Sequence, residues 1–248
     1  LSIQTDPRLY RNREAMVAQA VRFSELAPNI IVKLPVTSIG LQAIEEATAR
    51  GVSINATVSF SVPQAVAVAE AVERGLQSRE STGQDISTMG PVCTIMVGRL
   101  DDWLKVVANR DDIICDPEAL EWAGVAAMKQ AYRIYRERGY RLRLLSAAFR
   151  NHLHWSAFIG GDVVISPPFK WQRRYNTSGI EIHPYIEEPV PQRWLDELQK
   201  HFADFRRAYE PDGMTPQEFD GFGPTVRTLR QFAQACTDLA VLMRDFML

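Results

Sequence analysis

The chain has 248 residues, of which 46% are hydrophobic and 23% are charged, and its formal net charge is −2. These values are ordinary for a globular protein of one large domain or two small ones, and the near-neutral charge gives no reason to expect binding to nucleic acid or to an anionic membrane surface. No apolar run approaches the roughly 18–20 residues of a membrane span, and the N-terminus lacks a signal-peptide pattern. We therefore expect a cytoplasmic protein without membrane contact.

The cysteines and histidines argue against a metal site. The three cysteines, Cys93, Cys115 and Cys236, are widely spaced and odd in number. This spacing does not suggest a disulfide framework or a CxxC metal motif, and it fits a reducing compartment. His152 and His154 stand two residues apart, which places them on opposite sides of a helix. We expect no bound metal.

Short apolar runs alternate with helical patterns along the chain. The expected strands are 1–5, 30–34, 52–60, 92–97, 141–147 and 162–166. The expected helices are 12–26, 38–50, 62–76, 101–109, 117–139, 150–159, 192–209 and 225–247. Thr37 or Ser38 is the expected N-cap of the second helix and Ser61 that of the third. The segments 77–90 and 171–191 show no regular pattern.

Strict alternation of strand and helix requires a parallel sheet with helices outside it. A doubly wound sheet and a (β/α) barrel are both compatible with six such units. No G-x-G-x-x-G follows any expected strand, which argues against a dinucleotide-binding fold.

Polar residues occupy equivalent places in or just after successive strands. They are Gln4, Lys33, Asn55, Thr57, Thr94, Arg99 and Arg150. Taken singly, each has an ordinary reading: a snorkelling lysine, strand-forming threonines and solvated arginines. In a barrel, however, the whole set would converge on the mouth at the C-terminal ends of the strands.

The chemistry of such a mouth centres on Lys33, within the run I-I-V-K-L-P. Desolvation lowers the pKa of a lysine from about 10.4 toward ~7–8, which makes a free amine available to attack a ketone and form a Schiff base. Two arginines suit a phosphate, because guanidinium binds it bidentately. A lysine that forms a Schiff base with a ketose phosphate indicates class I aldol chemistry.

Five motifs of this sequence resemble the transaldolase family, in the same order along the chain. They are S-I-Q-T-D-P-R-L, N-I-I-V-K-L-P-V-T-S-I-G-L-Q-A-I, G-V-S-I-N-A-T-V-S-F-S, V-G-R-L-D-D-W and S-A-A-F-R-N. The resemblance covers most of the chain up to about Ser166, and the C-terminal helices have a looser counterpart. It implies a (β/α)8 TIM barrel in one domain, with strands 3 to 8 in about 1–170 and extra helices in about 190–248.

The resemblance also implies a reaction and the residues that perform it. The reaction would transfer a dihydroxyacetone unit from sedoheptulose 7-phosphate or fructose 6-phosphate to an aldose phosphate, without a cofactor, in the pentose phosphate pathway. Lys33 would form the Schiff base, and Thr57 and the residue at Gln4 would serve the catalytic water. The implied substrate-binding residues are Asn55, Thr94, Arg99, Arg150 and Thr37.

Two substitutions depart from the family pattern. Gln4 stands where the family has a glutamate, and a neutral amide can hold a water but cannot take its proton. Fructose-6-phosphate aldolases resemble this chain in having glutamine there, but they have a tyrosine where this chain has Met96. Ala148 replaces a serine near the phosphate site. A fructose-6-phosphate-aldolase-like lyase, or a weakened homologue that only binds sugar phosphate or serves in assembly, therefore stays open.

The chain begins at what resembles the third barrel strand. Six strands cannot close such a barrel, and its open edges would be liable to aggregation. We expect that a preceding region of two β units completes the barrel, or that a second polypeptide or a homo-oligomer does so. The preferred acceptor and the oligomeric state stay open.

Overall fold

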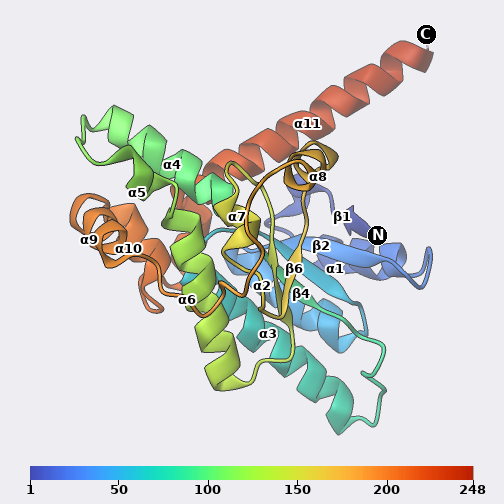
Figure 1. Ribbon diagram of the computed structural model, residues 1–248. Coiled ribbons are helices and arrows are strands. Elements are labelled where there is room, and N and C mark those ends of the chain that lie inside the picture. Colours follow the sequence, from blue (N-terminus) through green and yellow to red (C-terminus); the bar gives the residue numbers. More distant parts are fainter. Residues whose placement is uncertain (248) are drawn as a thin grey trace.

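The computed structural model describes residues 1–247, so the expected domain end at residue 248 lies just outside them. Within the described residues, six strands form one sheet in the order β1-β2-β3-β4-β5-β6, and each neighbouring pair is parallel. The strands are β1 (Ser2–Gln4), β2 (Ile31–Pro35), β3 (Ile54–Ser59), β4 (Val92–Ile95), β5 (Arg143–Ser146) and β6 (Val163–Ile165). This arrangement, shown in Figure 1, confirms the predicted α/β class, and it is that of a partial TIM barrel.

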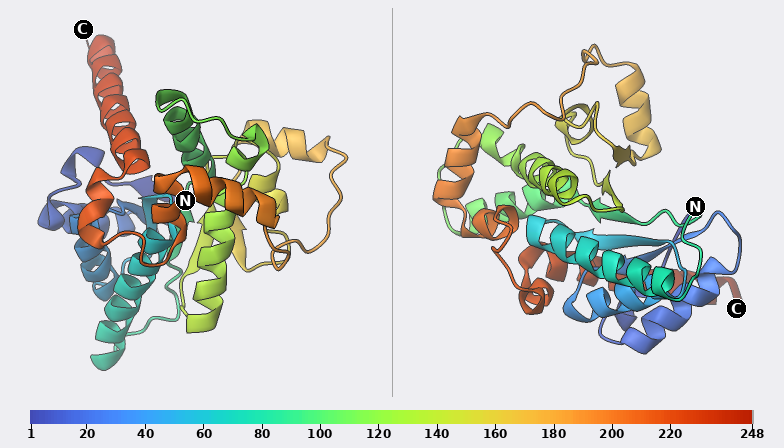
Figure 2. Two further views of the ribbon diagram at one scale, coloured as in Figure 1. Left: turned by 90° about the vertical axis from the view of Figure 1, so that its left-hand side faces the viewer. Right: turned by 90° about the horizontal axis from the view of Figure 1, so that it is seen from below.

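Helices follow each strand and cover the outer face of the sheet (Figure 1, Figure 2). The helices of the strand-bearing part are α1 (Arg13–Ser24), α2 (Ser38–Ala49), α3 (Val62–Ser81), α4 (Val97–Arg110), α5 (Pro117–Leu120), α6 (Ala123–Arg138), α7 (Leu153–Ser156) and α8 (Phe169–Asn176). A short 3-10 helix, η1 (Pro7–Leu9), follows β1. Between them and the sheet lies a core of fully buried aliphatic side chains, including Val32, Leu34, Ile44 and Ile54.

Side-chain caps begin the helices where the sequence predicted them. Thr37 Oγ1 accepts a hydrogen bond from Gly40 N at 2.9 Å, and Ser61 Oγ accepts one from Gln64 N at 3.3 Å. Each hydroxyl satisfies a backbone donor that has no partner inside its helix. Thr37, rather than Ser38, is therefore the N-cap of α2.

Several boundaries differ from those expected from the sequence. Helix α3 continues to Ser81, and α4 already begins at Val97, so that Arg99 lies in its first turn. The helix expected over 117–139 is broken into α5 and α6, because the chain turns to bring α6 against α4: a Cβ on Gly124 would stand 2.2 Å from the carbonyl oxygen of Val97. Helix α8 was missed because it is short and its contact with the core is limited to the partly buried Trp171 and Tyr175, with no fully buried residue.

The C-terminal part consists of α9 (Gln192–His201), α10 (Ala203–Tyr209), the 3-10 helix η2 (Pro216–Gly221) and α11 (Gly223–Met247). Four fully buried phenylalanines attach this part to the body: Phe202, Phe205, Phe219 and Phe222. The first turns of α11 pack on the body, whereas its C-terminal half projects away from it (Figure 1). No helix within residues 1–247 is both long enough and apolar enough to cross a membrane.

Candidate active site

Gln4, Lys33 and Asn55 lie in one row across three neighbouring strands. Gln4 pairs with Lys33, and Lys33 pairs with Asn55, in the parallel registers of β1, β2 and β3. Residues paired in this way point to the same face of a sheet. The Nδ2 atom of Asn55 lies 3.4 Å from Ser2 Oγ, across the intervening strand β2. Side chains of β1 and β3 can meet across β2 only on the side toward which the sheet curves. The face that carries Lys33 is therefore the concave, inner face.

Lys33 is half-buried on this face and has no polar partner for its ammonium group among residues 1–247. Desolvation by burial lowers the pKa of Lys33 from its usual value of 10.5. Gln4 contacts only the backbone of this residue, since its Nε2 lies 3.4 Å from the Lys33 carbonyl oxygen. The amine of Lys33 is thus not engaged by another polar group of the described residues, and at a given pH a larger fraction of it is neutral than for a solvated lysine.

Asn55 is held in a fixed orientation by Thr94 on the next strand. Thr94 Oγ1 donates a hydrogen bond of 2.7 Å to Asn55 Oδ1, and both side chains are buried. With Oδ1 occupied, the amide Nδ2 points the opposite way, across β2 (the strand of Lys33) toward Ser2 of β1. Thr57, two residues after Asn55 on β3, is buried on the same face.

The backbone of β3 is irregular immediately after Thr57. Val58 has a φ of 58°, and the register between β3 and β4 shifts between Ala56 and Ser59. A positive φ is a strained conformation for a β-branched residue, and such bulges re-aim neighbouring side chains. Buried Gln64 stabilises this conformation, because its Nε2 donates to the Val58 carbonyl at 3.2 Å and its Oε1 accepts from Phe60 N at 3.0 Å. The placement of Thr57 therefore depends on Gln64.

Three arginines line a small pocket between α4, the turn after β5, and α11. They are Arg99, Arg150 and Arg227, and the other lining residues are Asp102, Pro224, Thr228 and Gln231. Arg150 forms a bidentate ion pair with Asp102, with Nε–Oδ1 at 3.1 Å and Nη2–Oδ2 at 2.7 Å. Arg99 Nη1 donates to Thr228 Oγ1 at 3.1 Å, and burial lowers the pKa of Arg99, as does the neighbouring Arg150 to a smaller extent. The pocket is strongly cationic and suits an anion such as phosphate.

A buried pair of side chains supports the turn that carries Arg150. His154 Nδ1 accepts a hydrogen bond from the backbone N of Arg150 at 2.9 Å, so its proton is on Nε2 and is donated to Asp101 Oδ2 at 2.7 Å. Asp101 Oδ1 in turn accepts from Gly124 N at 2.8 Å, and burial raises the pKa of the Asp101 carboxyl. Both side chains of the pair are fully buried.

Close packing fixes the same turn from the other side. A Cβ on Gly98 would stand 2.1 Å from the carbonyl oxygen of Ala148, so only glycine lets the first turn of α4 approach this closely. Ala148 itself has a φ of 65°, a left-handed conformation. The two arginines predicted for phosphate, Arg99 and Arg150, are therefore brought together by a tightly constrained contact between α4 and the turn.

Thr37 lies where its motif places it, but both of its side-chain hydrogen bonds are to backbone atoms. Its Oγ1 accepts from Gly40 N and donates to the Tyr10 carbonyl at 3.1 Å, and its side chain is buried. The structure shows it as a helix cap, and its role in substrate binding stays a prediction.

Sequence reasoning did not select several residues of the site. Asp102 stands within the V-G-R-L-D-D-W motif, but nothing in the sequence marked it as the partner of Arg150. Asp101, His154, Arg227, Thr228 and Gln231 were missed because their partners are far away in the chain. For the α11 residues, a signal was the spacing of Arg227, Thr228 and Gln231, which puts them on one helix face.

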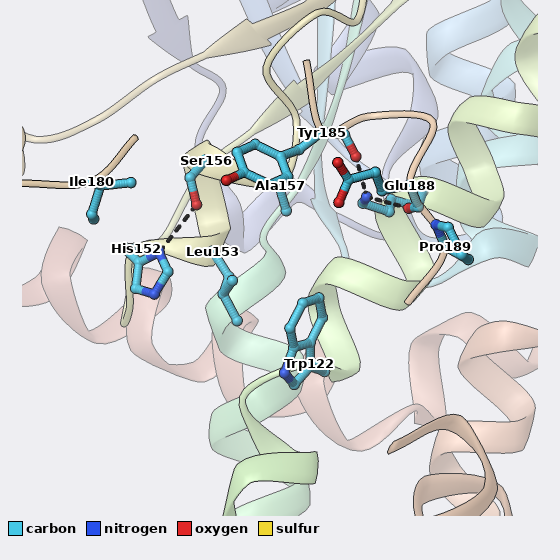
Figure 3. Close-up of a pocket in the computed structure, with 10 residues that line it drawn as sticks. Trp122, His152, Leu153, Ser156, Ala157, Ile180, Tyr185, Glu188 and Pro189 are labelled. Atoms are coloured by element: carbon cyan, nitrogen blue, oxygen red, sulfur yellow. Dashed lines mark hydrogen bonds between the residues drawn. The ribbon is translucent and has the colours of Figure 1, made fainter. Parts of the chain in front are cut away.

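Another pocket lies outside the inner face, between α6, α7 and the segment 180–189 (Figure 3). In it, His152 Nδ1 lies 3.1 Å from Ser156 Oγ, and the rings of Trp122 and Tyr185 also line the pocket. The ammonium group of Lys129 donates to the carbonyl of Tyr185 at 2.5 Å and to that of Glu188 at 2.6 Å. These contacts attach the segment to α6, and none of the predicted site residues takes part.

Comparison with known proteins identifies the family. The family model described as Transaldolase/Fructose-6-phosphate aldolase matches residues 1–210. The chain belongs to this family. The predicted recognition is thereby confirmed, and the matched range contains every transaldolase-family motif quoted above, whereas α11 lies beyond it.

Curated relatives within the transaldolase family cover a part of the chain. Transaldolase from Thermobifida fusca (strain YX) is 37% identical over 142 residues, which are 55% of this chain and 38% of that protein. The transaldolases of Mycobacterium tuberculosis (strain ATCC 25618 / H37Rv) and Mycobacterium ulcerans (strain Agy99) are each 35% identical over 142 residues, or 37% of their length. The match thus spans less than two fifths of the length of these relatives.

Proposed function

We propose that this protein is a transaldolase that transfers a dihydroxyacetone unit between sugar phosphates through an imine on Lys33. The observation that carries the proposal is the position of Lys33: a half-buried amine with a lowered pKa, in one row with Asn55 and without a polar partner among residues 1–247. The cationic pocket of Arg99 and Arg150 supports a phosphorylated substrate, because both arginines follow the C-terminal ends of strands, β4 and β5, of the sheet that carries Lys33 in β2.

The proposed reaction begins when the neutral Lys33 Nζ attacks the C2 carbonyl of a ketose phosphate, and loss of water leaves an imine. The C3–C4 bond then breaks, its electrons pass into the imine to give an enamine, and the departing aldehyde is glyceraldehyde 3-phosphate if the substrate is fructose 6-phosphate. The enamine carbon adds to the carbonyl of an acceptor aldehyde, and water hydrolyses the new imine. Asn55 Nδ2 would hold a hydroxyl of the bound three-carbon unit, and its orientation by Thr94 supports this assignment.

Bond cleavage also requires that the C4 hydroxyl lose its proton. Gln4, the side chain adjacent to Lys33 in the row, is an amide and cannot accept that proton. A water positioned by Thr57 and Gln4 would therefore carry the proton away. The amide in place of a carboxylate is the observation that favours a second candidate function, cleavage of fructose 6-phosphate without transfer.

A product assay separates the candidates. Release of glyceraldehyde 3-phosphate from fructose 6-phosphate is measured with and without erythrose 4-phosphate, with the Lys33→Met variant as control. Without the acceptor a transaldolase releases no more than one equivalent per active site, and it turns over and forms sedoheptulose 7-phosphate only with the acceptor, whereas a lyase turns over without acceptor. Release by the wild-type protein that equals that of Lys33→Met would contradict both enzymatic functions and favour a protein that only binds sugar phosphate or serves in assembly.

We also propose that further strands close the barrel between β1 and β6. In residues 1–247 each of these two strands pairs with only one neighbour, which leaves two open sheet edges. Light scattering with intact mass measurement tests this. The active species should contain more polypeptide than one chain of 28.0 kDa, and an active monomer of that mass alone would contradict it.

A further inference from the structure

We propose that Arg227 on α11 is a third phosphate-binding cation of the candidate active site, and that α11 is a clamp over the substrate phosphate. The inference rests on the proposed function, since it assumes a phosphorylated ketose. Helix α11 lies beyond the range that matches the family model, so nothing in the family match assigns it this role.

One face of α11 is directed at the two predicted phosphate-binding arginines. The helix residues that line the pocket with Arg99 and Arg150 are Pro224, Arg227, Thr228 and Gln231. Their spacing is i, i+3, i+4 and i+7, which is one continuous face of an α-helix. The pocket is therefore formed jointly by the mouth of the sheet and by this helix.

The charges of the pocket are unbalanced. It contains three guanidinium groups and a single carboxylate, Asp102, which is already paired with Arg150, so two positive charges are uncompensated. Neither Arg99 nor Arg227 has an ion-pair partner among residues 1–247. In the same described part of the chain, the Nε of Arg99 is buried without an acceptor. A dianionic phosphate would supply both the missing charge and the missing acceptor.

The hydrogen bonds of Arg99 show how α11 and the pocket are coupled. Arg99 Nη1 donates to Thr228 Oγ1 at 3.1 Å and to Gln231 Oε1 at 2.5 Å, and its guanidinium lies 5.5 Å from the ring centre of Phe232. These acceptors are neutral oxygens, and phosphate oxygens bind guanidinium more strongly. A bound phosphate would therefore compete for Arg99 while remaining beside Arg227.

The start of α11 is fixed to the mouth of the sheet, which gives the clamp a rigid base. Gln64 Nε2, which supports the bulge in β3, lies 3.4 Å from Thr225 Oγ1, and Ser38 N donates to Asp220 Oδ1 at 2.8 Å. Thr225 and Thr228 are both buried. Arg227, in contrast, is exposed, so its guanidinium is free to reorient toward an entering anion.

Two variants of the same helix test the inference. Arg230 is exposed, lies one turn from Arg227 and is not part of the pocket, which makes Arg230→Gln the matched control for Arg227→Gln. The readout is the concentration that gives half-maximal borohydride trapping on Lys33, measured for fructose 6-phosphate and for unphosphorylated dihydroxyacetone. We expect Arg227→Gln to raise this concentration about tenfold or more for fructose 6-phosphate only, and Arg230→Gln to change neither.

Two results would overturn the inference: an unchanged concentration for fructose 6-phosphate in Arg227→Gln, or an equal rise for dihydroxyacetone. A wild-type protein that forms no adduct at all would instead refute the proposed function. In that case inorganic phosphate is the probe: it should raise the melting temperature of the wild type and of Arg230→Gln, but not that of Arg227→Gln. Equal stabilisation of all three would contradict the clamp.

Discussion

Thr94 donates a 2.7 Å hydrogen bond to the amide oxygen of Asn55, and this bond joins β4 to β3 on the inner face of the sheet. Because Oδ1 of Asn55 is occupied, the amide nitrogen points across β2, the strand that carries Lys33, toward Ser2 of β1. A hydroxyl at position 94 therefore sets the orientation of a group that is proposed to hold the substrate.

Thr94→Val should weaken substrate binding and stability together. The substitution leaves the buried Asn55 Oδ1 without a donor, which costs about 1–3 kcal/mol of unfolding free energy. Thr94→Ser keeps the hydroxyl and should retain most of both properties. Urea denaturation and the concentration of fructose 6-phosphate needed for adduct formation measure the two effects. Equal behaviour of the Val and Ser variants would show that the hydrogen bond does not orient Asn55.

Lys33→Met should leave the fold intact and change the pH dependence of stability. The pKa of Lys33 is lowered by burial in the folded state, so the unfolded chain binds more protons between that lowered pKa and 10.5. The unfolding free energy of the wild type therefore rises with pH across this interval. Below the lowered pKa, Lys33 is charged in the folded state, and the full destabilisation caused by burying that charge is present. Lys33→Met removes this cost, so at pH 7 it should be at least as stable as the wild type.

The comparison is made by urea denaturation from neutral pH upward. The stability advantage of Lys33→Met should shrink as the pH approaches 10.5. Lys129→Met is an informative second variant, because Lys129 donates to two backbone carbonyls and its removal should destabilise the protein. A constant difference between wild type and Lys33→Met at every pH would contradict a lowered pKa.

Asp101→Asn should destabilise the protein and impair the phosphate pocket from a distance. Asp101 accepts from His154 Nε2 and from Gly124 N, and an amide offers only one oxygen for these two donors. One buried donor is left unsatisfied, which costs about 1–3 kcal/mol. Asp111→Asn, in an exposed ion pair with Arg110, is the control and should change little.

The effect of Asp101→Asn on function should be specific to phosphate. Because His154 holds the backbone of Arg150, the variant should lose affinity for fructose 6-phosphate more than for dihydroxyacetone. Trapping of both ketones measures this. A loss of stability with unchanged relative affinity would mean that the pair supports only the fold.

Gln4→Glu should raise transfer relative to cleavage. A carboxylate next to Lys33 can take the proton from the C4 hydroxyl or from the catalytic water, whereas the present amide cannot. The measurement is the ratio of sedoheptulose 7-phosphate formed to free glyceraldehyde 3-phosphate released without acceptor. Gln4→Met, which cannot hold a water, is the comparison. A ratio that is the same in all three proteins would exclude position 4 from the proton transfer.

The sequence predicted the strands and the row of site residues because parallel strands place equivalent positions at one edge of a sheet. Lys33, Asn55 and Thr57 were found because polar residues are unusual in buried strands. The pairing of Asp101 with His154, and of Arg99 with α11, could not be found in this way. Those contacts join residues 53 and 129 positions apart, and only tertiary packing brings them together.

Local boundaries were less predictable for a related reason. The strained φ of Val58 and the left-handed φ of Ala148 are imposed by contacts with Gln64 and with α4, not by their own propensities. Helix α8 has only two partly buried side chains that pack against the core, Trp171 and Tyr175, and these were too few to mark it in the sequence.

The most direct test of the account is to locate the covalent adduct. The protein is incubated with fructose 6-phosphate, reduced with borohydride, digested and mapped by mass spectrometry, with Lys33→Met in parallel. We expect a reduced dihydroxyacetone adduct on the peptide that contains Lys33 and none in the variant. An unmodified Lys33, or an adduct on another lysine that persists in Lys33→Met, would contradict it.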